Sequence, residues 1–129
     1  KSLPVKIIMH NIGSIDSIAN VVFVAGEERY ASPHSTFLFH GVTFDFANPT
    51  SFNSIQLAEL SDIVKKSHKK IASIVCENSE MTEAEIEKLF DTGEVKSAEF
   101  AVKKKIISEI KTLELPKDAP LVSINFSSK

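Results

Sequence analysis

The stretch Gly13-Ser14-Ile15-Asp16-Ser17-Ile18-Ala19-Asn20-Val21-Val22-Phe23-Val24-Ala25-Gly26 decides the fold that this sequence predicts. It follows an apolar run over 5–9, which is typical of a buried strand. From Ser17 onward the apolar residues recur at helical spacing, and Gly26 is a stop signal for that helix. The pattern therefore predicts that Ser17 lies where a strand gives way to a helix, beside backbone N–H groups without intrahelical partners.

Two interpretations of Ser17 follow from this position. A serine at the start of a helix most often only caps the helix. The unpaired N–H groups and the positive end of the helix dipole can also hold an oxyanion. The next segment favours the second interpretation, because a polar turn over 29–35 leads into an apolar strand over 36–40 that ends in His40. A serine at a helix start and a histidine at a strand end are the two halves of a catalytic pair.

The order of these features resembles the Clp protease proteolytic subunit, and in particular the shorter Clp-like peptidases of phage and bacterial genomes. That order is Gly-x-x-x-Ser, a helix ending in Ala-Gly, then Arg-Tyr-Ala-x-Pro, then a strand ending in His. The matching residues are Gly13, Ser17, Ala25, Gly26, Arg29, Tyr30, Pro33 and His40. The resemblance implies an α/β fold of the Clp protease and crotonase type, a spiral of strand–strand–helix units. It also implies a serine endopeptidase that cleaves peptides or unfolded proteins.

The resemblance assigns the nucleophile to Ser17 and the general base to His40, and it gives the N–H of Ile18 one half of the oxyanion hole. A gap-free alignment places the family's acidic residue on a glycine, so a neighbouring acid must substitute. The candidates are Asp91 and Glu94. We favour Asp91, because the glycine after it lets the loop bend back, although a helix-end carboxylate in solvent is an equally open interpretation.

Two further departures from the family pattern concern the oxyanion. The family's Gly-Gly pair, which supplies the second N–H donor, would lie upstream of the strand over 5–9, and this chain lacks it. Losing one such donor typically costs about 100- to 1000-fold in rate. We therefore expect either that the N-terminal part of the fold is missing before Lys1 or that the enzyme is damaged. Asp16 stands directly before Ser17, where its charge either opposes an oxyanion or faces away and caps the helix.

Two other classes of function stay open. A crotonase-like acyl-CoA enzyme would share the fold without needing a Ser–His pair, and a catalytically inactive assembly subunit would keep the fold without a complete site. The resemblance implies no metal and no cofactor. His10, His34 and His68 share no metal-ligand spacing with a cysteine or an acid, and we interpret them as polar turn or helix-face residues. The single cysteine, Cys76, excludes an intrachain disulfide and is interpreted as a small core residue.

The rest of the chain predicts helices and a tail. Alternating residues over 42–46 predict a strand or hairpin arm, and a long amphipathic helix is predicted over 54–77. Together, at about 42–77, they resemble the family's handle, which interlocks with the handle of a facing ring. The pair Thr82 and Glu85 is a capping box that predicts another helix. Further predictions are a Ser97 cap, a helix over 98–104, a closing strand over 106–110, and an edge strand or docking segment over 121–126.

Composition limits the domain count and the partners. The 129 residues, of which 43% are hydrophobic and 25% charged, fit one globular domain. We divide them into a core over 1–110 and a C-terminal extension over 111–129. A net charge of −2 gives no basic field for nucleic acid or a membrane surface, and no apolar run reaches the roughly 20 residues of a membrane helix. We expect a cytoplasmic protein, and the resemblance implies a ring-like homo-oligomer with an ATP-dependent unfoldase as partner.

Overall fold

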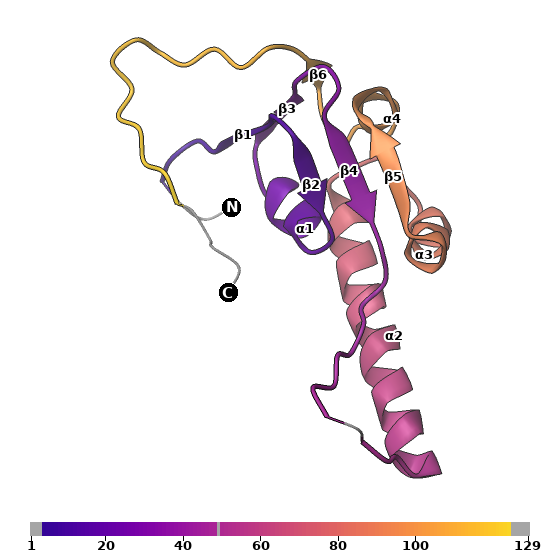
Figure 1. The fold of residues 1–129 in the computed structure, drawn as a ribbon. Helices are drawn as coiled ribbons and strands as arrows, with labels where there is room; N and C mark the ends of the chain where they lie inside the picture. The colour runs from indigo at the N-terminus through magenta and orange to yellow at the C-terminus, as the bar shows by residue number, and fades with distance from the viewer. Residues whose placement is uncertain (1–3, 49, 125–129) are drawn as a thin grey trace.

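The computed structural model describes residues 4–48 and 50–124, in which two small sheets lie among four helices (Figure 1). In chain order the elements are β1 (Ile8–Asn11), β2 (Ser14–Asp16), α1 (Ala19–Phe23), β3 (Glu28–Ala31), β4 (Thr36–Phe39), α2 (Ser54–Glu77), α3 (Glu83–Thr92), β5 (Glu94–Ser97), α4 (Ala98–Lys103) and β6 (Glu109–Ile110). One sheet has the strand order β1-β3-β6 and the other β2-β4-β5.

The chain repeats one unit of two strands and a helix. In β1-β2-α1, the first strand joins one sheet and the second strand joins the other sheet, and β3-β4-α2 repeats that path. The repeated strands pair in parallel, with Ile8 opposite Glu28 and Ser14 opposite Thr36. β6 continues the first sheet in parallel, while β5 adds to β4 in the antiparallel direction. The predicted α/β spiral of strand–strand–helix units is therefore confirmed.

Several predicted strand bounds are wrong. The polar residues at 28–31 form β3 and not a turn, and the strand predicted over 5–9 runs instead from Ile8 to Asn11. β2 forms at 14–16, where the sequence pattern predicts no strand, and the strand predicted over 106–110 has only two residues. These strands are short, and each is held by main-chain bonds to a strand distant in sequence. An apolar repeat therefore carries little information about them.

No strand forms over 42–46, where alternation predicts one. A strand needs a neighbouring strand for its main-chain hydrogen bonds, and this segment has none in the described part of the chain. Its aromatic side chains pack on one another instead. Phe46 meets Phe52 edge-on with ring centroids 4.9 Å apart, and it stacks with Phe44 at 6.3 Å.

The helix ends follow local signals in the sequence. α2 starts with a capping box in which Gln56 N–H donates to Asn53 Oδ1 at 2.9 Å and Asn53 N–H donates to Gln56 Oε1 at 3.0 Å. The predicted box of Thr82 and Glu85 starts α3, which ends at Gly93 in the left-handed conformation, with φ of 62°. With 24 residues, α2 spans about 36 Å and extends well beyond the sheets (Figure 1).

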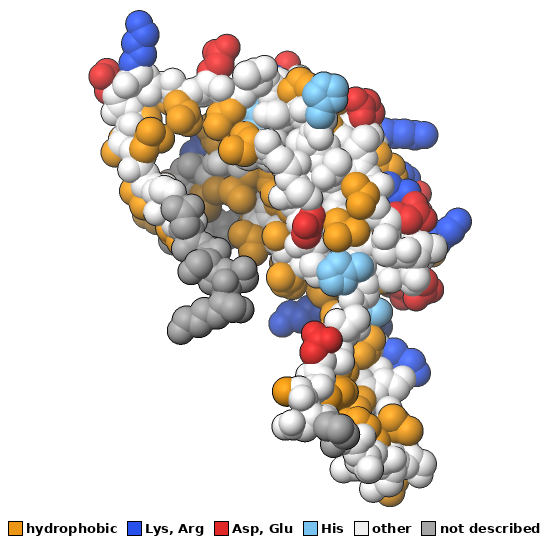
Figure 2. All heavy atoms as spheres, in the orientation of Figure 1, with side chains coloured by type: hydrophobic (Ala, Val, Ile, Leu, Met, Phe, Trp, Pro, Cys, Tyr) orange, Lys and Arg blue, Asp and Glu red, His pale blue; other side chains and the backbone are white. Residues whose placement is uncertain are grey.

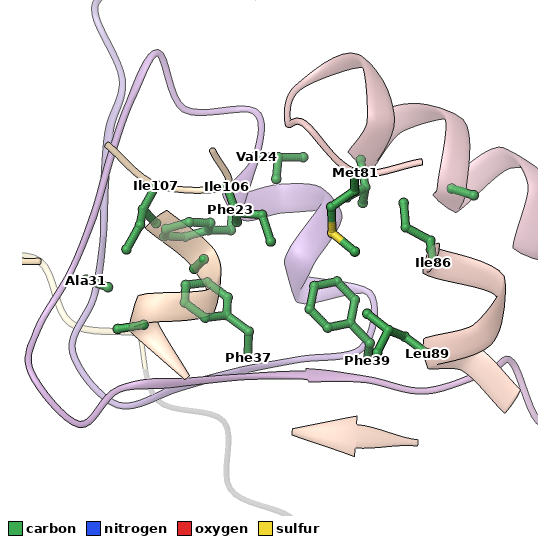
Figure 3. Close-up of a cluster of buried hydrophobic side chains, with 14 of the residues drawn as sticks. Phe23, Val24, Ala31, Phe37, Phe39, Met81, Ile86, Leu89, Ile106 and Ile107 are labelled. Carbon is green, nitrogen blue, oxygen red and sulfur yellow. The ribbon is translucent and has the colours of Figure 1, made fainter. Parts of the chain in front are cut away.

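A single core of buried side chains joins the sheets to the helices (Figure 3). At its centre the ring of Phe23 from α1 packs edge-on against that of Phe37 from β4, with centroids 5.4 Å apart. Residues of β4 alternate between core and sheet face, so the strand that leads to His40 is fixed by burial. The buried hydrophobic residues are Phe23, Val24, Ala31, Phe37, Phe39, Ala72, Val75, Met81, Ile86, Leu89, Phe90, Ala98, Ala101, Ile106 and Ile107.

Arg29 of β3 ties the ends of several helices together through main-chain oxygens. Its Nε donates to Ile106 O at 2.6 Å and its Nη2 donates to Asn78 O at 2.7 Å. Partial burial lowers the pKa of the guanidinium. Carbonyls that follow α1, α2 and α4 therefore converge on one side chain. Its further acceptors are the carbonyls of Val24, Gly26 and Lys105.

The C-terminal extension forms no helix or strand over 111–124 and leads away from the sheets (Figure 1). The edge strand predicted over 121–126 does not form at 121–124, and its last two residues lie outside the described residues. Within the described ranges, no helix combines the length and the apolar composition needed to cross a membrane.

Candidate active site

Ser17 lies at the junction of β2 and α1 with a positive φ of 54°. This conformation is uncommon for residues other than glycine and tends to occur at functional sites. Ser17 N–H donates to Leu38 O at 2.9 Å. The buried Asn20 side chain donates to Ser17 O at 3.0 Å and to Leu38 O at 2.9 Å. α1 and β4 thus hold the strained residue from two sides.

The serine does not cap the helix that follows it. The residue at the N-cap of α1 is Ile18, and no side chain makes a capping hydrogen bond there. Ordinary capping, the simpler interpretation of Ser17, therefore does not describe its place in the structure. Within the described residues, the N–H of Ile18 makes no hydrogen bond, so this donor is available to a ligand.

A cavity of about 600 Å³ opens beside Ser17, between α1, the end of β4, the segment after β4 and α2. His40 follows the last residue of β4 and lines the same cavity. The structure therefore brings the two predicted residues to one cavity, although no direct hydrogen bond joins them among the described contacts. Such bonds often tighten only when substrate binds. The lining is mainly apolar and includes Val21, Phe39, Val42, Ile71, Ile74, Val75 and Phe90.

The ring of His40 has a defined partner on one side. Its Nδ1 lies 2.8 Å from Gly41 O. A carbonyl oxygen can only accept a hydrogen bond, so in the neutral ring this contact favours the proton on Nδ1 and leaves Nε2 as the acceptor. This is the tautomer that a histidine needs in order to remove a proton from a serine through Nε2.

No hydrogen bond joins either predicted acid to His40 among the described contacts. Asp91 is exposed near the end of α3, lies outside the cavity lining, and makes no hydrogen bond to His40 within the described residues. Glu94 pairs with Lys96 and accepts from the hydroxyl of Thr92 at 2.9 Å. Lys96, with a smaller contribution from Thr92, holds the pKa of the Glu94 carboxyl below its usual value.

Asp16 and Ser14 are the polar residues of β2, directly before the proposed nucleophile. Both side chains project from the same face of β2, and the hydroxyl of Ser14 donates to Asp16 Oδ1. Neither lines the cavity, and α1 has no acidic residue in its first turn. Asp16 therefore neither caps the helix nor contributes to the cavity wall.

His68 is a residue whose role the sequence pattern does not indicate. It lies on α2, where we interpret it as a helix-face residue, but its Nε2 accepts the N–H of Val42 at 2.8 Å. Its ring also packs against that of Phe90, with centroids 4.8 Å apart. The partners are distant in sequence, so no local motif marks the contact. In the described part of the chain, no three His, Cys, Asp or Glu side chains are grouped as a metal site would need.

Comparison with protein families gives a match over most of the chain. The family model described as Clp protease matches residues 1–114 of the chain. A search among curated proteins found no match. The matched range includes both sheets, all four helices and every residue of the cavity described above.

Proposed function

Because the chain belongs to the Clp protease family, we propose that it is a serine endopeptidase with Ser17 as nucleophile and His40 as general base. Family membership indicates peptidase activity, and the assignment of residues is our inference. The observation that carries it is that a strained serine and a histidine whose Nδ1 faces a carbonyl oxygen line the same cavity. Its mainly apolar walls suit the side chain of a peptide substrate.

The proposed reaction has two halves. His40 Nε2 takes the proton of Ser17 as Oγ attacks the peptide carbonyl carbon, and the N–H of Ile18 donates to the developing oxyanion. Collapse breaks the C–N bond, and His40 returns the proton to the leaving amine. Water then attacks the acyl ester with His40 as base again, which releases the carboxylic acid and restores the serine hydroxyl.

Labelling by a fluorophosphonate tests the nucleophile directly. We expect the unaltered chain to be labelled and to cleave a peptide, and we expect Ser17→Ala to lose both while keeping its far-UV circular dichroism. Ser14→Ala is the matched control, because that serine belongs to the same segment but lies outside the cavity. Undiminished labelling of Ser17→Ala would remove the assignment. Absence of labelling in the unaltered chain would favour the inactive subunit, or the crotonase-like enzyme if the chain binds immobilised CoA.

The third member of a triad remains a prediction, with Asp91 as its candidate. If Asp91 orients His40 during turnover, Asp91→Asn should lower the peptidase rate by several orders of magnitude, as an incorrect tautomer does in serine proteases. Glu94→Gln is the comparison, since Glu94 is already engaged by Lys96. A large loss in Glu94→Gln alone would move the role to that residue. Unchanged rates in both variants would leave His40 held by the main chain.

We further propose self-assembly and a cytoplasmic location. Clp protease family members are generally oligomeric. The protruding α2 and the aromatic cluster of Phe44, Phe46 and Phe52 supply exposed apolar surface for contact with another copy, in keeping with a handle at about 42–77 and a core over 1–110. An ATP-dependent unfoldase remains the partner expected to deliver unfolded protein.

A further inference from the structure

One peptide group lies between two histidine rings. The carbonyl of Gly41 faces His40 Nδ1 at 2.8 Å, and the N–H of Val42 donates to His68 Nε2 at 2.8 Å. These two groups belong to the same planar peptide unit. The orientation of that plane is therefore set at one edge by His68 and presented at the other edge to His40.

The surroundings of His68 hold its ring in place. It packs on the buried Phe90, whose carbonyl accepts the N–H of Gly41 at 3.1 Å. A Cβ atom at Gly41 would lie 3.0 Å from His68 Nε2 and 3.3 Å from Phe90 O, so the ring lies tightly against the glycine. The peptide between His40 and α2 thus has little freedom to rotate.

We propose that His68 is a positioning residue for His40 and acts through the Gly41–Val42 peptide. The proposal rests on the proposed function, because it takes His40 as the base. A peptide that donates its N–H becomes a stronger acceptor at its carbonyl, so the bond to His68 strengthens the bond that keeps the proton on Nδ1. The peptide and His68 thus hold His40 where serine peptidases commonly use a carboxylate.

This arrangement also couples α2 to the catalytic histidine. His68 is a residue of the long helix, whereas His40 and the peptide follow β4. A shift of α2 that withdrew His68 would free the peptide plane, and the tautomer of His40 would no longer be selected. The hydrogen bond from Val42 N–H to His68 Nε2 therefore determines whether His40 Nε2 is free to accept a proton.

The test compares two substitutions in the full chain. His68→Phe keeps a ring against Phe90 but removes the acceptor, while His68→Gln returns an acceptor oxygen. Nitrogen-15 shifts of the His40 ring report its tautomer whether or not the protein cleaves peptides. We expect Nδ1–H in the unaltered chain, a mixture of tautomers in His68→Phe, and a return toward Nδ1–H in His68→Gln. The rate of fluorophosphonate labelling should fall about 10- to 100-fold in His68→Phe, part of the 10²–10⁴ that acid–base catalysis supplies.

The outcomes separate the two proposals. An unchanged His40 tautomer and labelling rate in His68→Phe overturn the positioning role, even if the protein is a peptidase. A changed tautomer in a protein that is never labelled supports the positioning of His40 and counts against peptidase activity. If His68→Phe does not fold, a scalar coupling across the hydrogen bond between Val42 N and His68 Nε2 is measured in the unaltered chain. We expect the coupling to be present, and its absence overturns the proposal.

Discussion

At Ser17 the backbone keeps a left-handed conformation of a kind that costs of order 1–3 kcal/mol. The surrounding structure must offset this cost, and Asn20 is the side chain placed to do so. Its amide bridges Ser17 O and Leu38 O, which joins the start of α1 to the end of β4. The proposed nucleophile is therefore held by a residue that has no chemical role in the proposed reaction.

Replacing Asn20 by alanine tests this support. Two part-buried carbonyls would each lose one of their donors, so we expect Asn20→Ala to lower the free energy of unfolding by about 1–3 kcal/mol, measured by urea denaturation. Labelling of Ser17 should slow as well, because the turn can relax. Val22→Ala, an exposed position in the same helix, is the control and should change neither quantity. Equal stability of the two variants would show that Asn20 is not the support.

At this scale the sequence indicates the two catalytic candidates but not the residues that hold them. Ser17 and His40 can be proposed from the sequence because each lies at a recognisable local pattern, a helix start or a strand end. Asn20 and His68 act through main-chain atoms of Leu38 and Val42. These partners are distant in sequence, so residue spacing does not predict the contacts. Their roles follow from tertiary contact alone.

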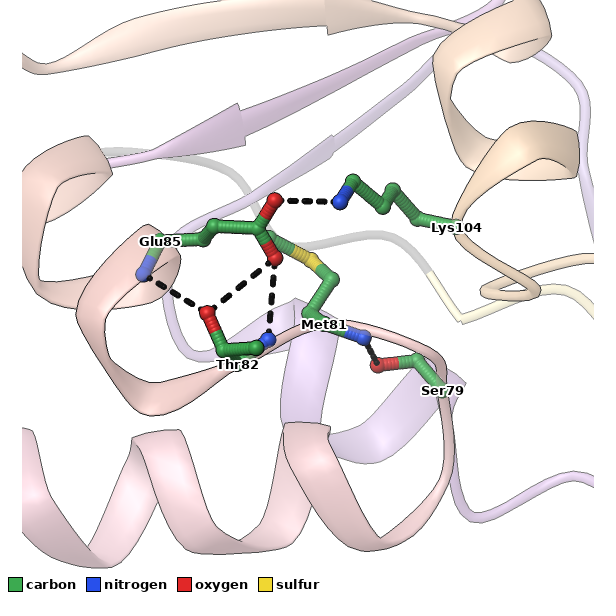
Figure 4. Close-up of polar contacts among 5 residues, drawn as sticks. All are labelled: Ser79, Met81, Thr82, Glu85 and Lys104. Atoms are coloured by element: carbon green, nitrogen blue, oxygen red, sulfur yellow. Dashed lines mark hydrogen bonds and ion pairs between the residues drawn. The ribbon is translucent and has the colours of Figure 1, made fainter.

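Between elements, the carboxylate of Glu85 links α3 to α4 (Figure 4). Glu85 accepts the N–H of Thr82 at 3.0 Å in the capping box and pairs with Lys104, the C-cap residue of α4. The ion pair with Lys104, followed by the bond from Thr82, lowers the pKa of the Glu85 carboxyl. A group with a lowered pKa in the folded state contributes stability above its unfolded value and loses that contribution as pH falls through its folded value.

Glu85→Gln separates the charge from the cap, because glutamine can still accept from Thr82 N–H. We expect this variant to be less stable than the unaltered chain at neutral pH and equally stable once the pH lies below the folded pKa of Glu85. Urea midpoints measured from pH 7 down into the acid range give the comparison. Glu87→Gln, on the same helix, is the control. A constant difference across that range would argue against titration of Glu85.

The elements differ in how far sequence determines them. The bounds of α2 and the start of α3 are predicted because apolar spacing and capping residues are local signals. β3 has a polar sequence and exists because β1 and β6 lie on either side of it. The segment over 42–46 shows the converse, since it has the alternation of a strand but no partner strand, and its rings turn to Phe52 instead.

In the molecule as a whole, the protruding part of α2 exposes apolar surface. The helix protrudes from the body, and hydrophobic side chains line the protruding part (Figure 2). Ile55 is 69% exposed, Leu57 54% and Ile63 49%, which is more apolar surface than one isolated helix needs. Ile71, by contrast, packs against the core and lines the cavity, so it does not belong to this exposed surface.

The double substitution Ile55→Lys and Ile63→Lys should therefore shift the oligomer to smaller species, because two charges would be buried where α2 contacts another copy. Light scattering coupled to size exclusion measures the mass, and the helix content should stay unchanged. Asp62→Lys adds positive charge to the same helix without removing apolar surface, and we expect it to assemble normally. A double variant with the mass of the unaltered protein would show that α2 is not the assembly surface.

Arg29 makes hydrogen bonds to main-chain carbonyls that do not depend on pH in the acid range. Its acceptors are amide carbonyls, which do not ionise, and the guanidinium keeps its charge throughout the acid range. Acidification removes the carboxylate pairs at the surface, Glu85 with Lys104 among them, but leaves this junction intact. An acid-stressed molecule should thus lose its surface ion pairs while the ends of α1, α2 and α4 stay joined through the side chain of Arg29.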